Sequence, residues 1–199
     1  MKKELYQRLI ALREEAKAFG EPVLRDKSFE LLLEVANARQ PQKLLEIGVN
    51  RGLSGIGMLL QSPSSTLTGI EIDEGKIAIA KSNYLEFGLQ DRAKIFCGDA
   101  SEIIPVLTGE YDLIFLDGPK GHYFEYLPNL LAVLKKGGVL FADNVLFRGY
   151  VDGKVKTPHR FNTTKRSMEN FLKAITNSSE LKTQIYDMED GVSVTEKLV

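Results

Sequence analysis

The chain has 199 residues, which is enough for one α/β domain with a substantial core. Apolar residues make up 43% and charged residues 27%, so the chain is too apolar to be disordered, and its net charge of −1 gives no overall signal for nucleic acid. The single cysteine, Cys97, excludes an intrachain disulfide and a zinc site built on several thiolates, and no apolar run is long enough to cross a membrane. We expect a cytoplasmic protein in which Cys97 packs inside an apolar strand.

Two helices are expected ahead of the first strand. Apolar residues recur at helical spacing over residues 3–19, which predicts the first helix. A second helix is expected over residues 26–38, where the leading aspartate is a typical N-cap. We therefore predict one domain over residues 1–199, with N-terminal helices in residues 1–38 and a core in residues 39–199.

Short apolar runs then alternate with helical stretches. Runs rich in branched residues predict five strands, at residues 43–47, 66–72, 93–97, 111–116 and 138–142. Helices are expected between and after them, at residues 54–61, 74–87, 100–107, 123–135 and 163–176. Such alternation is typical of a parallel sheet with helices on both faces.

The end of the chain follows another pattern. Residues 181–188 and 191–197 flank Glu189 and Asp190 and predict an antiparallel hairpin. The whole pattern predicts an α/β, Rossmann-like methyltransferase fold, with a mostly parallel seven-stranded sheet and a C-terminal antiparallel hairpin. A dinucleotide dehydrogenase would instead have a doubled βαβαβ plan.

Glycines follow the first predicted strand, where an open α/β sheet binds its ligand. Gly48 and Gly52, in the segment that ends at Ser54, permit a tight turn and a close approach to a ligand. Their G-x-x-x-G spacing differs from the G-x-G-x-x-G of pyrophosphate sites and favours a nucleoside without a diphosphate. A mere tight turn is the alternative. Glu46, inside the strand, either orders this loop or meets the ammonium group of the cofactor.

Acidic residues stand at the ends of the next two strands. A carboxylate at Glu71 can accept both ribose hydroxyls, and Asp99 could accept the adenine amino group. The alternative is that both acids are helix N-caps or solvated loop residues. Because these features occur at three successive strand ends, we favour a nucleoside cofactor site.

Oxygen ligands follow the fourth and fifth strands. Asp117 follows one strand, and Asp143 and Asn144 follow the other, so we expect them side by side. Two carboxylates and an amide oxygen suit Mg²⁺, or Mn²⁺ or Ca²⁺ in its place. Such an ion would make a bound hydroxyl more acidic and direct it toward a methyl donor. A dication and partial burial would lower the pKa of Lys120 toward that of a base. The alternative is that both aspartates cap helices and Lys120 is solvated.

These segments resemble the cation-dependent O-methyltransferase family, which includes catechol and caffeoyl-CoA O-methyltransferases. The resemblance covers roughly residues 22–198 and rests on residues 48–54, 71–73, 98–100, 117–123 and 143–147. It implies a homodimer that uses S-adenosylmethionine and Mg²⁺, with metal ligands Asp117, Asp143 and Asn144 and catalytic base Lys120. The predicted cofactor-binding residues are Glu46, Gly48, Gly52, Ser54, Glu71, Asp99 and Asp117.

Within that family the chain is most similar to the bacterial tRNA 5-hydroxyuridine methyltransferases, through residues 22–28, 143–151 and 190–194. Leu53 departs from the family pattern, which usually has a tyrosine before Ser54. This departure bears on the acceptor rather than on the cofactor or the metal.

A basic segment after the fifth strand also bears on the acceptor. Residues 147–166 hold six lysines and arginines against one acid, with aromatic residues interleaved. Such a segment could contact phosphates while a ring stacks a base; a flexible lid whose charges only keep it soluble is the alternative. The candidate substrate or tRNA contacts are Tyr123, Arg148 and Arg160.

The resemblance to the tRNA branch favours tRNA 5-hydroxyuridine as acceptor. Its O5 and O4 form a chelating pair like the two oxygens of a catechol, so the same site chemistry would serve either acceptor. A small catechol-like acceptor is the alternative. The glycine spacing, the hairpin and the Asp-Asn pair disfavour an NAD(P)-dependent oxidoreductase. The intact Asp117, Lys120, Asp143 and Asn144 disfavour a non-catalytic RNA-binding module.

Overall fold

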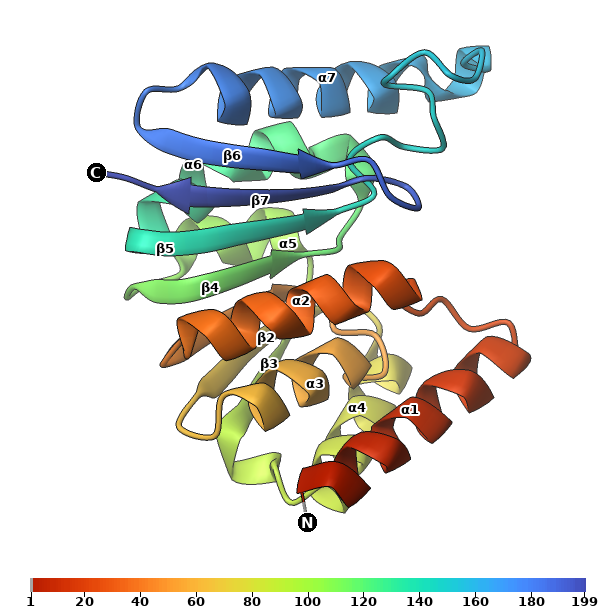
Figure 1. The fold of residues 1–199 in the computed structure, drawn as a ribbon, viewed down its shortest axis with the longest axis vertical. Helices are drawn as coiled ribbons and strands as arrows, with labels where there is room; N and C mark the ends of the chain where they lie inside the picture. Colours follow the sequence, from red (N-terminus) through yellow and green to blue (C-terminus); the bar gives the residue numbers. More distant parts are fainter. Residues whose placement is uncertain (1) are drawn as a thin grey trace. The chain divides into compact units, whose positions relative to one another are not determined.

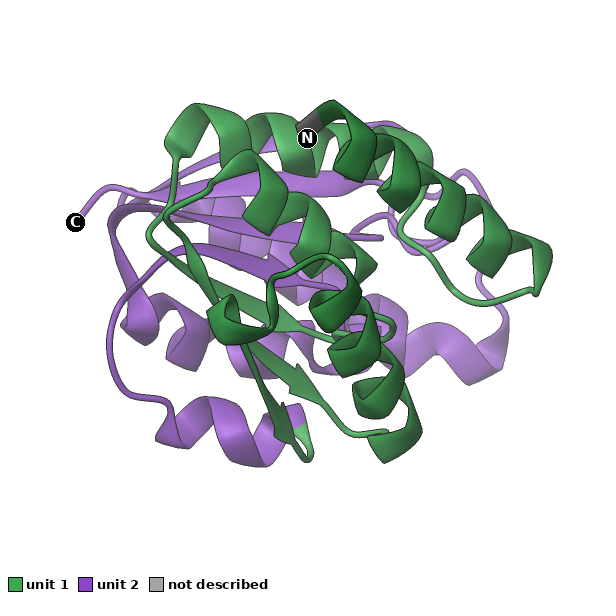
Figure 2. Cartoon of the chain, turned by 90° about the horizontal axis from the view of Figure 1, so that it is seen from below, with its two compact units in different colours: residues 1–99 green, residues 100–199 purple. Residues whose placement is uncertain are grey.

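The computed structural model describes residues 2–199, and the chain divides into two compact units, residues 1–99 and residues 100–199 (Figure 2). The N-terminal helices belong to the same compact unit as the first three strands, rather than forming a separate segment. The single domain over residues 1–199 stays a prediction.

The first unit contains four helices, one short 3-10 turn and three strands among its described residues. In chain order these are α1 (Lys2–Ala18), α2 (Asp26–Arg39), β1 (Lys43–Ile47), α3 (Leu53–Gln61), β2 (Thr66–Glu71), α4 (Glu74–Glu86), η1 (Gln90–Arg92) and β3 (Ala93–Cys97). The strands are parallel in the order β3-β2-β1, and α1 and α2 both pack on α3 (Figure 1). Because Leu44, Leu45 and Ile47 are all fully buried, β1 has no solvated face, as expected of a strand covered on both sides.

A buried arginine joins the N-terminal helices. Arg13 of α1 is only 1% exposed, and its Nη2 donates to the Leu24 carbonyl (2.7 Å) and to Asp26 Oδ1 (3.0 Å). Its guanidinium lies 3.7 Å from the centroid of the Phe29 ring. Burial lowers the pKa of Arg13, and the Asp26 carboxylate opposes this effect. Asp26 itself is the first residue of α2 and not its N-cap, a position that Arg25 occupies without a side-chain cap.

The second unit contains the remaining strands. In chain order its elements are α5 (Ala100–Ile103), η2 (Ile104–Val106), β4 (Tyr111–Leu116), η3 (Lys120–His122), α6 (Tyr123–Val133), β5 (Leu134–Asp143), η4 (His159–Phe161), α7 (Asn162–Asn177), β6 (Leu181–Tyr186) and β7 (Val192–Lys197). Their order is β4-β5-β7-β6, with β4 and β5 parallel and the other two pairs antiparallel. The helix α7 runs alongside β6 and packs on α6 (Figure 1).

The predicted fold class is confirmed. Every predicted strand is present between residues 2 and 199, and β6 and β7 form the predicted antiparallel hairpin. Several boundaries differ. The strand β2 ends at Glu71 and not at residue 72, and the helix predicted over residues 100–107 is the short α5 followed by the 3-10 turn η2. The strand β5 begins at Leu134, where the end of a helix was predicted. The register of β4 and β5 shifts between Tyr111 and Leu113, and this irregularity accommodates the residues of β5 that precede Val139. Because these residues do not form an apolar run, the sequence pattern did not include them in the strand. No helix in the described part of the chain has both the length and the apolar character needed to span a bilayer.

Candidate active site

The predicted cofactor turn between β1 and α3 depends on its glycines. Gly48 and Gly52 have φ angles of 89° and 76°, in the left-handed region that favours glycine. A Cβ on Gly52 would also lie 3.1 Å from the ring of Tyr84. Gly52 is the N-cap of α3, so Ser54 lies in the first turn of that helix, where it is half-buried. The turn therefore has little room for larger residues at Gly52.

Three hydrogen bonds hold this turn in place. The Asn50 amide N–H donates to Glu71 Oε2 (2.8 Å), and Asn50 Nδ2 donates to the Pro22 carbonyl (2.7 Å). From α4, Asn83 Nδ2 donates to the Arg51 carbonyl (2.8 Å). The turn is thus tied to β2, to α4 and to the segment before α2, which is what a preformed binding loop requires.

Glu71 has a larger structural role than its sequence position indicates. Its side chain is buried, and its Oε1 accepts the N–H groups of Ile72 (3.0 Å) and Asp73 (3.1 Å). With the bond from Asn50, these occupy three of the roughly four acceptor positions of a carboxylate, so an acceptor position remains for a hydroxyl. The capping role considered for Glu71 belongs to Asp73, which accepts the Lys76 N–H at the start of α4 (3.1 Å).

Two residues at these strand ends differ from the sequence-based expectation. Ile72, predicted to end a buried strand, is 64% exposed directly after the buried Glu71. Cys97, predicted to be packed, is exposed at the end of β3, where it pairs in register with Glu71. Asp99 follows it and is exposed. The only feature of the sequence that could have indicated the exposure of Ile72 is its position one residue after Glu71, the acidic end of the strand.

Glu46 points into the interior of the first unit. It is fully buried, and a Cβ on Gly55 of α3 would lie 2.7 Å from its Oε2 and would collide with the hydroxyl of Tyr84. Burial, together with the charge of Glu46, raises the pKa of Tyr84. This placement favours the alternative in which Glu46 orders the loop over the one in which it meets a cofactor ammonium group.

In the second unit, the predicted metal ligands lie at one edge of the sheet. The last register pair of the parallel strands β4 and β5 is Leu116 with Ala142, so Asp117 and Asp143 come next on neighbouring strands. Asn144 has a left-handed φ of 57°, a conformation that asparagine tolerates better than most residues. Among residues 2–199, no three His, Cys, Asp and Glu side chains gather as a metal cluster; the predicted set has two acids and an amide.

Lys120 is paired with one of these acids. Its Nζ lies 2.6 Å from Asp117 Oδ1, and both side chains are largely shielded from solvent, which argues against a solvated lysine. Burial lowers the pKa of Lys120, but Tyr123 and Asp117 raise it by more, so the net shift is upward. The lowered pKa expected from the sequence refers to a site that holds a dication, so it stays a prediction.

Tyr123 was predicted as a substrate contact, and its packing in the structure disfavours that role. Its side chain is fully buried, and its hydroxyl donates to the Leu116 carbonyl (2.9 Å) and the Asp143 carbonyl (3.2 Å). The ring packs edge-on against Phe171 of α7, with 5.5 Å between the centroids. Sequence reasoning located the residue beside the site but could not tell which way its ring points.

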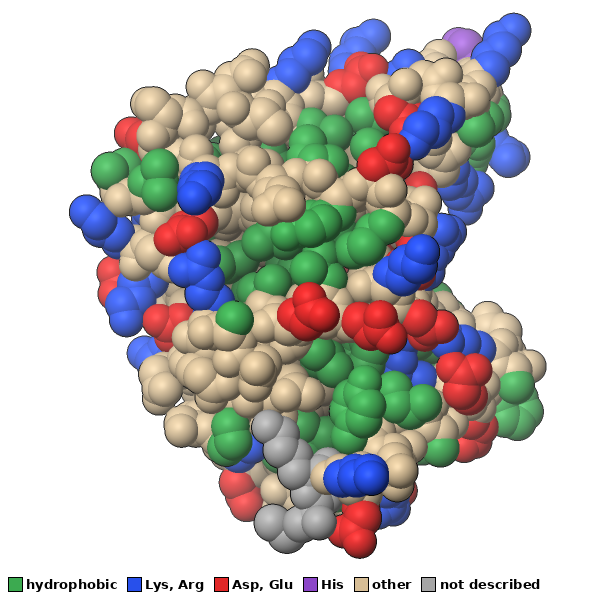
Figure 3. Space-filling view, viewed as in Figure 1, with side chains coloured by type: hydrophobic (Ala, Val, Ile, Leu, Met, Phe, Trp, Pro, Cys, Tyr) green, Lys and Arg blue, Asp and Glu red, His purple; other side chains and the backbone are tan. Residues whose placement is uncertain are grey.

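The basic segment after β5 has a defined packing. Phe147, Tyr150 and Phe161 contact one another with centroid distances of 5.4 to 5.7 Å, and the first two are buried. The guanidinium carbons of Arg148 and Arg160 lie 5.6 and 4.7 Å from the Phe161 ring. Lys and Arg side chains gather around this loop on the face shown in Figure 3. The exposed charges are thus available to an anionic ligand, whereas two of the rings are not available for stacking.

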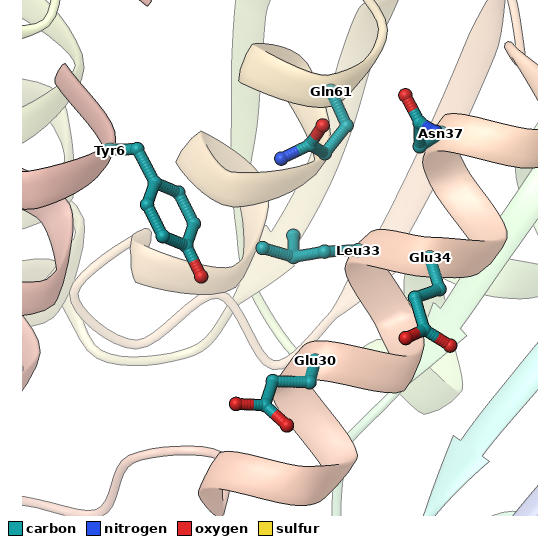
Figure 4. Close-up of a pocket in the computed structure, with 6 residues that line it drawn as sticks. All are labelled: Tyr6, Glu30, Leu33, Glu34, Asn37 and Gln61. Carbon is teal, nitrogen blue, oxygen red and sulfur yellow. The ribbon is translucent and has the colours of Figure 1, made fainter. Parts of the chain in front are cut away.

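The first unit also has a groove that contains none of the predicted site residues. It measures about 310 Å³ and is lined by residues of α1, α2 and α3, namely Tyr6, Glu30, Leu33, Glu34, Asn37 and Gln61 (Figure 4). Gln61 ends α3, whereas the cofactor turn precedes the first residue of that helix. The groove is therefore separate from the turn.

The fold and the site indicate a class of protein, and comparison with known proteins then gives the family. An α/β sheet with a glycine turn after β1 and acids at the following strand ends is typical of nucleoside-binding enzymes. The sequence model of the family described as O-methyltransferase matches residues 10–198. The chain belongs to the O-methyltransferase family, and the predicted enzyme class is confirmed.

Individual relatives agree with this assignment. Catechol O-methyltransferase of Sus scrofa is 36% identical over 137 residues, which are 63% of this chain and 72% of the pig protein. Caffeoyl-CoA O-methyltransferase of Populus kitakamiensis is 28% identical over 182 residues, which are 87% of this chain and 75% of that protein. The O-methyltransferase TomG of Streptomyces achromogenes, solved in complex with SAM, is 24% identical, with a TM-score of 0.84 over 96% of this chain and 89% of TomG. This last similarity supports the fold.

Proposed function

We propose that this chain uses S-adenosylmethionine to methylate a hydroxyl group held on a divalent cation. One observation carries the proposal: the parallel register of β4 and β5 ends just before Asp117 and Asp143, with Asn144 next in the chain. The names of the catechol and caffeoyl-CoA relatives support an oxygen acceptor, and the complex of TomG with SAM supports the methyl donor.

The first unit would hold the cofactor. Gly48 and Gly52 give the turn the close approach that a nucleoside needs, and Glu71 keeps an acceptor position for a ribose hydroxyl. Ile72 offers exposed apolar surface beside that carboxylate, which suits the face of a base. Asp99 is the candidate partner of the adenine amino group. Isothermal titration with S-adenosylmethionine and with NADH tests this assignment, since only the first should bind.

The second unit would hold the cation and the base. The oxygens of Asp117, Asp143 and Asn144 are hard ligands that fit Mg²⁺, Mn²⁺ or Ca²⁺. When bound, such an ion supplies Lewis-acid polarisation of the acceptor hydroxyl. Of the four residues, Lys120 is the one that we do not assign to the cation, and it is our candidate for the base that removes the hydroxyl proton. Its ion pair with Asp117 keeps a proton on Nζ, so the role of base requires that carboxylate to be engaged elsewhere.

The acceptor we propose is 5-hydroxyuridine in tRNA, and the exposed Arg148 and Arg160 support it as phosphate contacts. The names of the catechol relatives favour a small catechol-like acceptor as the second candidate. Mass spectrometry of tRNA nucleosides from a strain that lacks the gene separates the two. Loss of 5-methoxyuridine-type nucleosides would support tRNA, and unchanged nucleosides would favour the small phenol. We further propose a cytoplasmic homodimer, which light scattering on the purified chain would test.

Chelation tests the metal directly. Methyl transfer should stop in EDTA and return when Mg²⁺ or Mn²⁺ is added in excess. Asp143→Ala should abolish turnover while S-adenosylmethionine still binds, because Asp143 and the predicted cofactor turn are in different units. Undiminished turnover in chelator would refute the metal, and lost cofactor binding in Asp143→Ala would point to general misfolding.

A further inference from the structure

The geometry points to Tyr123 as the positioning residue that sets the spacing between Asp117 and Asp143, and through it the affinity of the site for its cation. This inference rests on the proposed function, because it concerns the same three ligands. It assigns to Tyr123 a role that differs from the substrate contact that its sequence position indicated.

The Tyr123 hydroxyl connects two strands at the point where their ladder ends. Its single proton is shared between the carbonyls of Leu116 (2.9 Å) and Asp143 (3.2 Å). The Leu116 carbonyl belongs to the peptide group that leads into Asp117, and the Asp143 carbonyl belongs to the one that leads into Asn144. The last register pair of β4 and β5 is Leu116 with Ala142, so the hydroxyl acts one step beyond it. A single side-chain group therefore restrains the backbone at all three predicted ligands.

The position of this hydroxyl is itself fixed by packing. Tyr123 is the first residue of α6 and is 0% exposed. Its ring meets Phe171 of α7 edge-on, with an interplanar angle of 70°, and the Lys120 ammonium lies 5.4 Å from the ring centroid. A side chain held by two helices and hydrogen-bonded to two strands cannot shift without moving them. The group is thus rigid enough to define a distance between two carboxylates.

Removal of the Tyr123 hydroxyl should have different effects if its role is purely structural and if it positions the metal ligands. If the hydroxyl only anchored α6, its removal would lower the melting temperature and leave metal affinity unchanged. If it sets the ligand spacing, metal affinity must fall, because groups that orient metal ligands typically contribute about 10-fold to 100-fold to affinity. Tyr123→Phe removes the hydroxyl and keeps the ring contact with Phe171, so the fold should persist.

The test measures Mn²⁺ binding by the full chain, using electron paramagnetic resonance or calorimetry. Tyr111→Phe is the matched control, because Tyr111 is also buried but lies at the other end of β4. We expect Tyr123→Phe to weaken Mn²⁺ binding at least about 10-fold, and Tyr111→Phe to bind Mn²⁺ like the wild type. S-adenosylmethionine affinity, measured in parallel, should change little in either variant. If Tyr123→Phe binds Mn²⁺ with wild-type affinity, the role of Tyr123 is refuted and the proposed function is not. If the wild-type chain binds no Mn²⁺, both the role of Tyr123 and the metal dependence of the proposed function are refuted.

Two more variants examine the mechanism. When Asp117 is already replaced by Asn, Tyr123→Phe should reduce Mn²⁺ affinity much less than it does in the wild type. The reason is that the spacing between positions 117 and 143 matters less once one of the two carboxylates is missing. Fully additive losses would contradict a role exerted through Asp117. Phe171→Leu keeps the hydroxyl but removes the aromatic contact that holds the ring, so it should weaken Mn²⁺ binding by less than Tyr123→Phe does. This second variant tests the inference even if Tyr123→Phe folds poorly, since unchanged affinity together with a lowered melting temperature would count against it.

Discussion

Alanine substitutions at Gly52 and Gly20 can separate two constraints on the cofactor turn, its left-handed backbone and its lack of space for a side chain. Their φ angles are nearly equal, 76° and 73°, but only Gly52 has neighbours within reach of an added Cβ. In either position the left-handed backbone of an alanine should lower the free energy of unfolding by roughly 1–2 kcal/mol. The smaller conformational entropy of alanine in the unfolded state should offset about 0.4–1 kcal/mol of this loss. We therefore expect Gly20→Ala to lower the free energy of unfolding by about 1 kcal/mol.

Gly52→Ala should cost more because of two close contacts. Its Cβ would lie 3.1 Å from Tyr84 Cε2 and 3.3 Å from the Cβ of Ala80, and such overpacking typically costs about 1–3 kcal/mol. The expected total is about 2–4 kcal/mol, a large share of the roughly 5–15 kcal/mol of a typical domain. Urea unfolding measures both variants, and calorimetry measures S-adenosylmethionine binding, which only Gly52→Ala should impair. Equal destabilisation by the two substitutions, or unimpaired cofactor binding by Gly52→Ala, would refute the reasoning.

Three more predictions concern the first unit. Arg13→Met should lower the free energy of unfolding by about 2 kcal/mol in thermal melts, because it removes the charged donor to Leu24 and Asp26 from a buried position. Glu71→Gln should weaken both S-adenosylmethionine binding and stability, since Glu71 accepts three backbone N–H groups. Substitution of the exposed Asp99 by Asn should weaken S-adenosylmethionine binding, which calorimetry measures. The hydrogen bond and ion pair with Lys17, and then those with Arg13, lower the pKa of Asp26, although partial burial opposes them. This stabilisation is present above the unfolded-state pKa near about 4 and is lost as the pH falls through the lower folded-state value, so the difference in melting temperature between the wild type and Asp26→Asn should shrink below about pH 4.

The strand ends were predictable from the sequence for a simple reason. Parallel strands bring their carboxyl ends to one edge, so finding each apolar run was enough to place Asp117 beside Asp143. The C-terminal hairpin was predictable because Glu189 and Asp190 separate two runs of the right length. Both inferences need only the order of elements along the chain, and neither depends on how a particular side chain packs.

The direction of individual side chains was not predictable in the same way. Beyond the end of a strand the alternation of faces stops, so the pattern could not show that Ile72 is exposed while Tyr123 is buried. The pattern also could not show the 2.6 Å contact of Lys120 with Asp117, which together with Tyr123 raises the pKa of Lys120. Burial of Glu46 depends on the space that Gly55 leaves in α3, a helix that follows it in the chain.

Several predicted site residues also hold the backbone, and this affects how substitutions should be interpreted. Asn144 is a proposed oxygen ligand, and it also has a φ of 57°, which a residue with an ordinary side chain adopts at a cost. Loss of metal binding in Asn144→Ala would therefore mix a missing ligand with a strained turn. Asn144→Gly keeps the turn and removes only the oxygen, so it isolates the ligand role. For Glu71, which is an acceptor for three N–H groups and a proposed ribose ligand, no single substitution makes that separation, and binding must be measured beside stability.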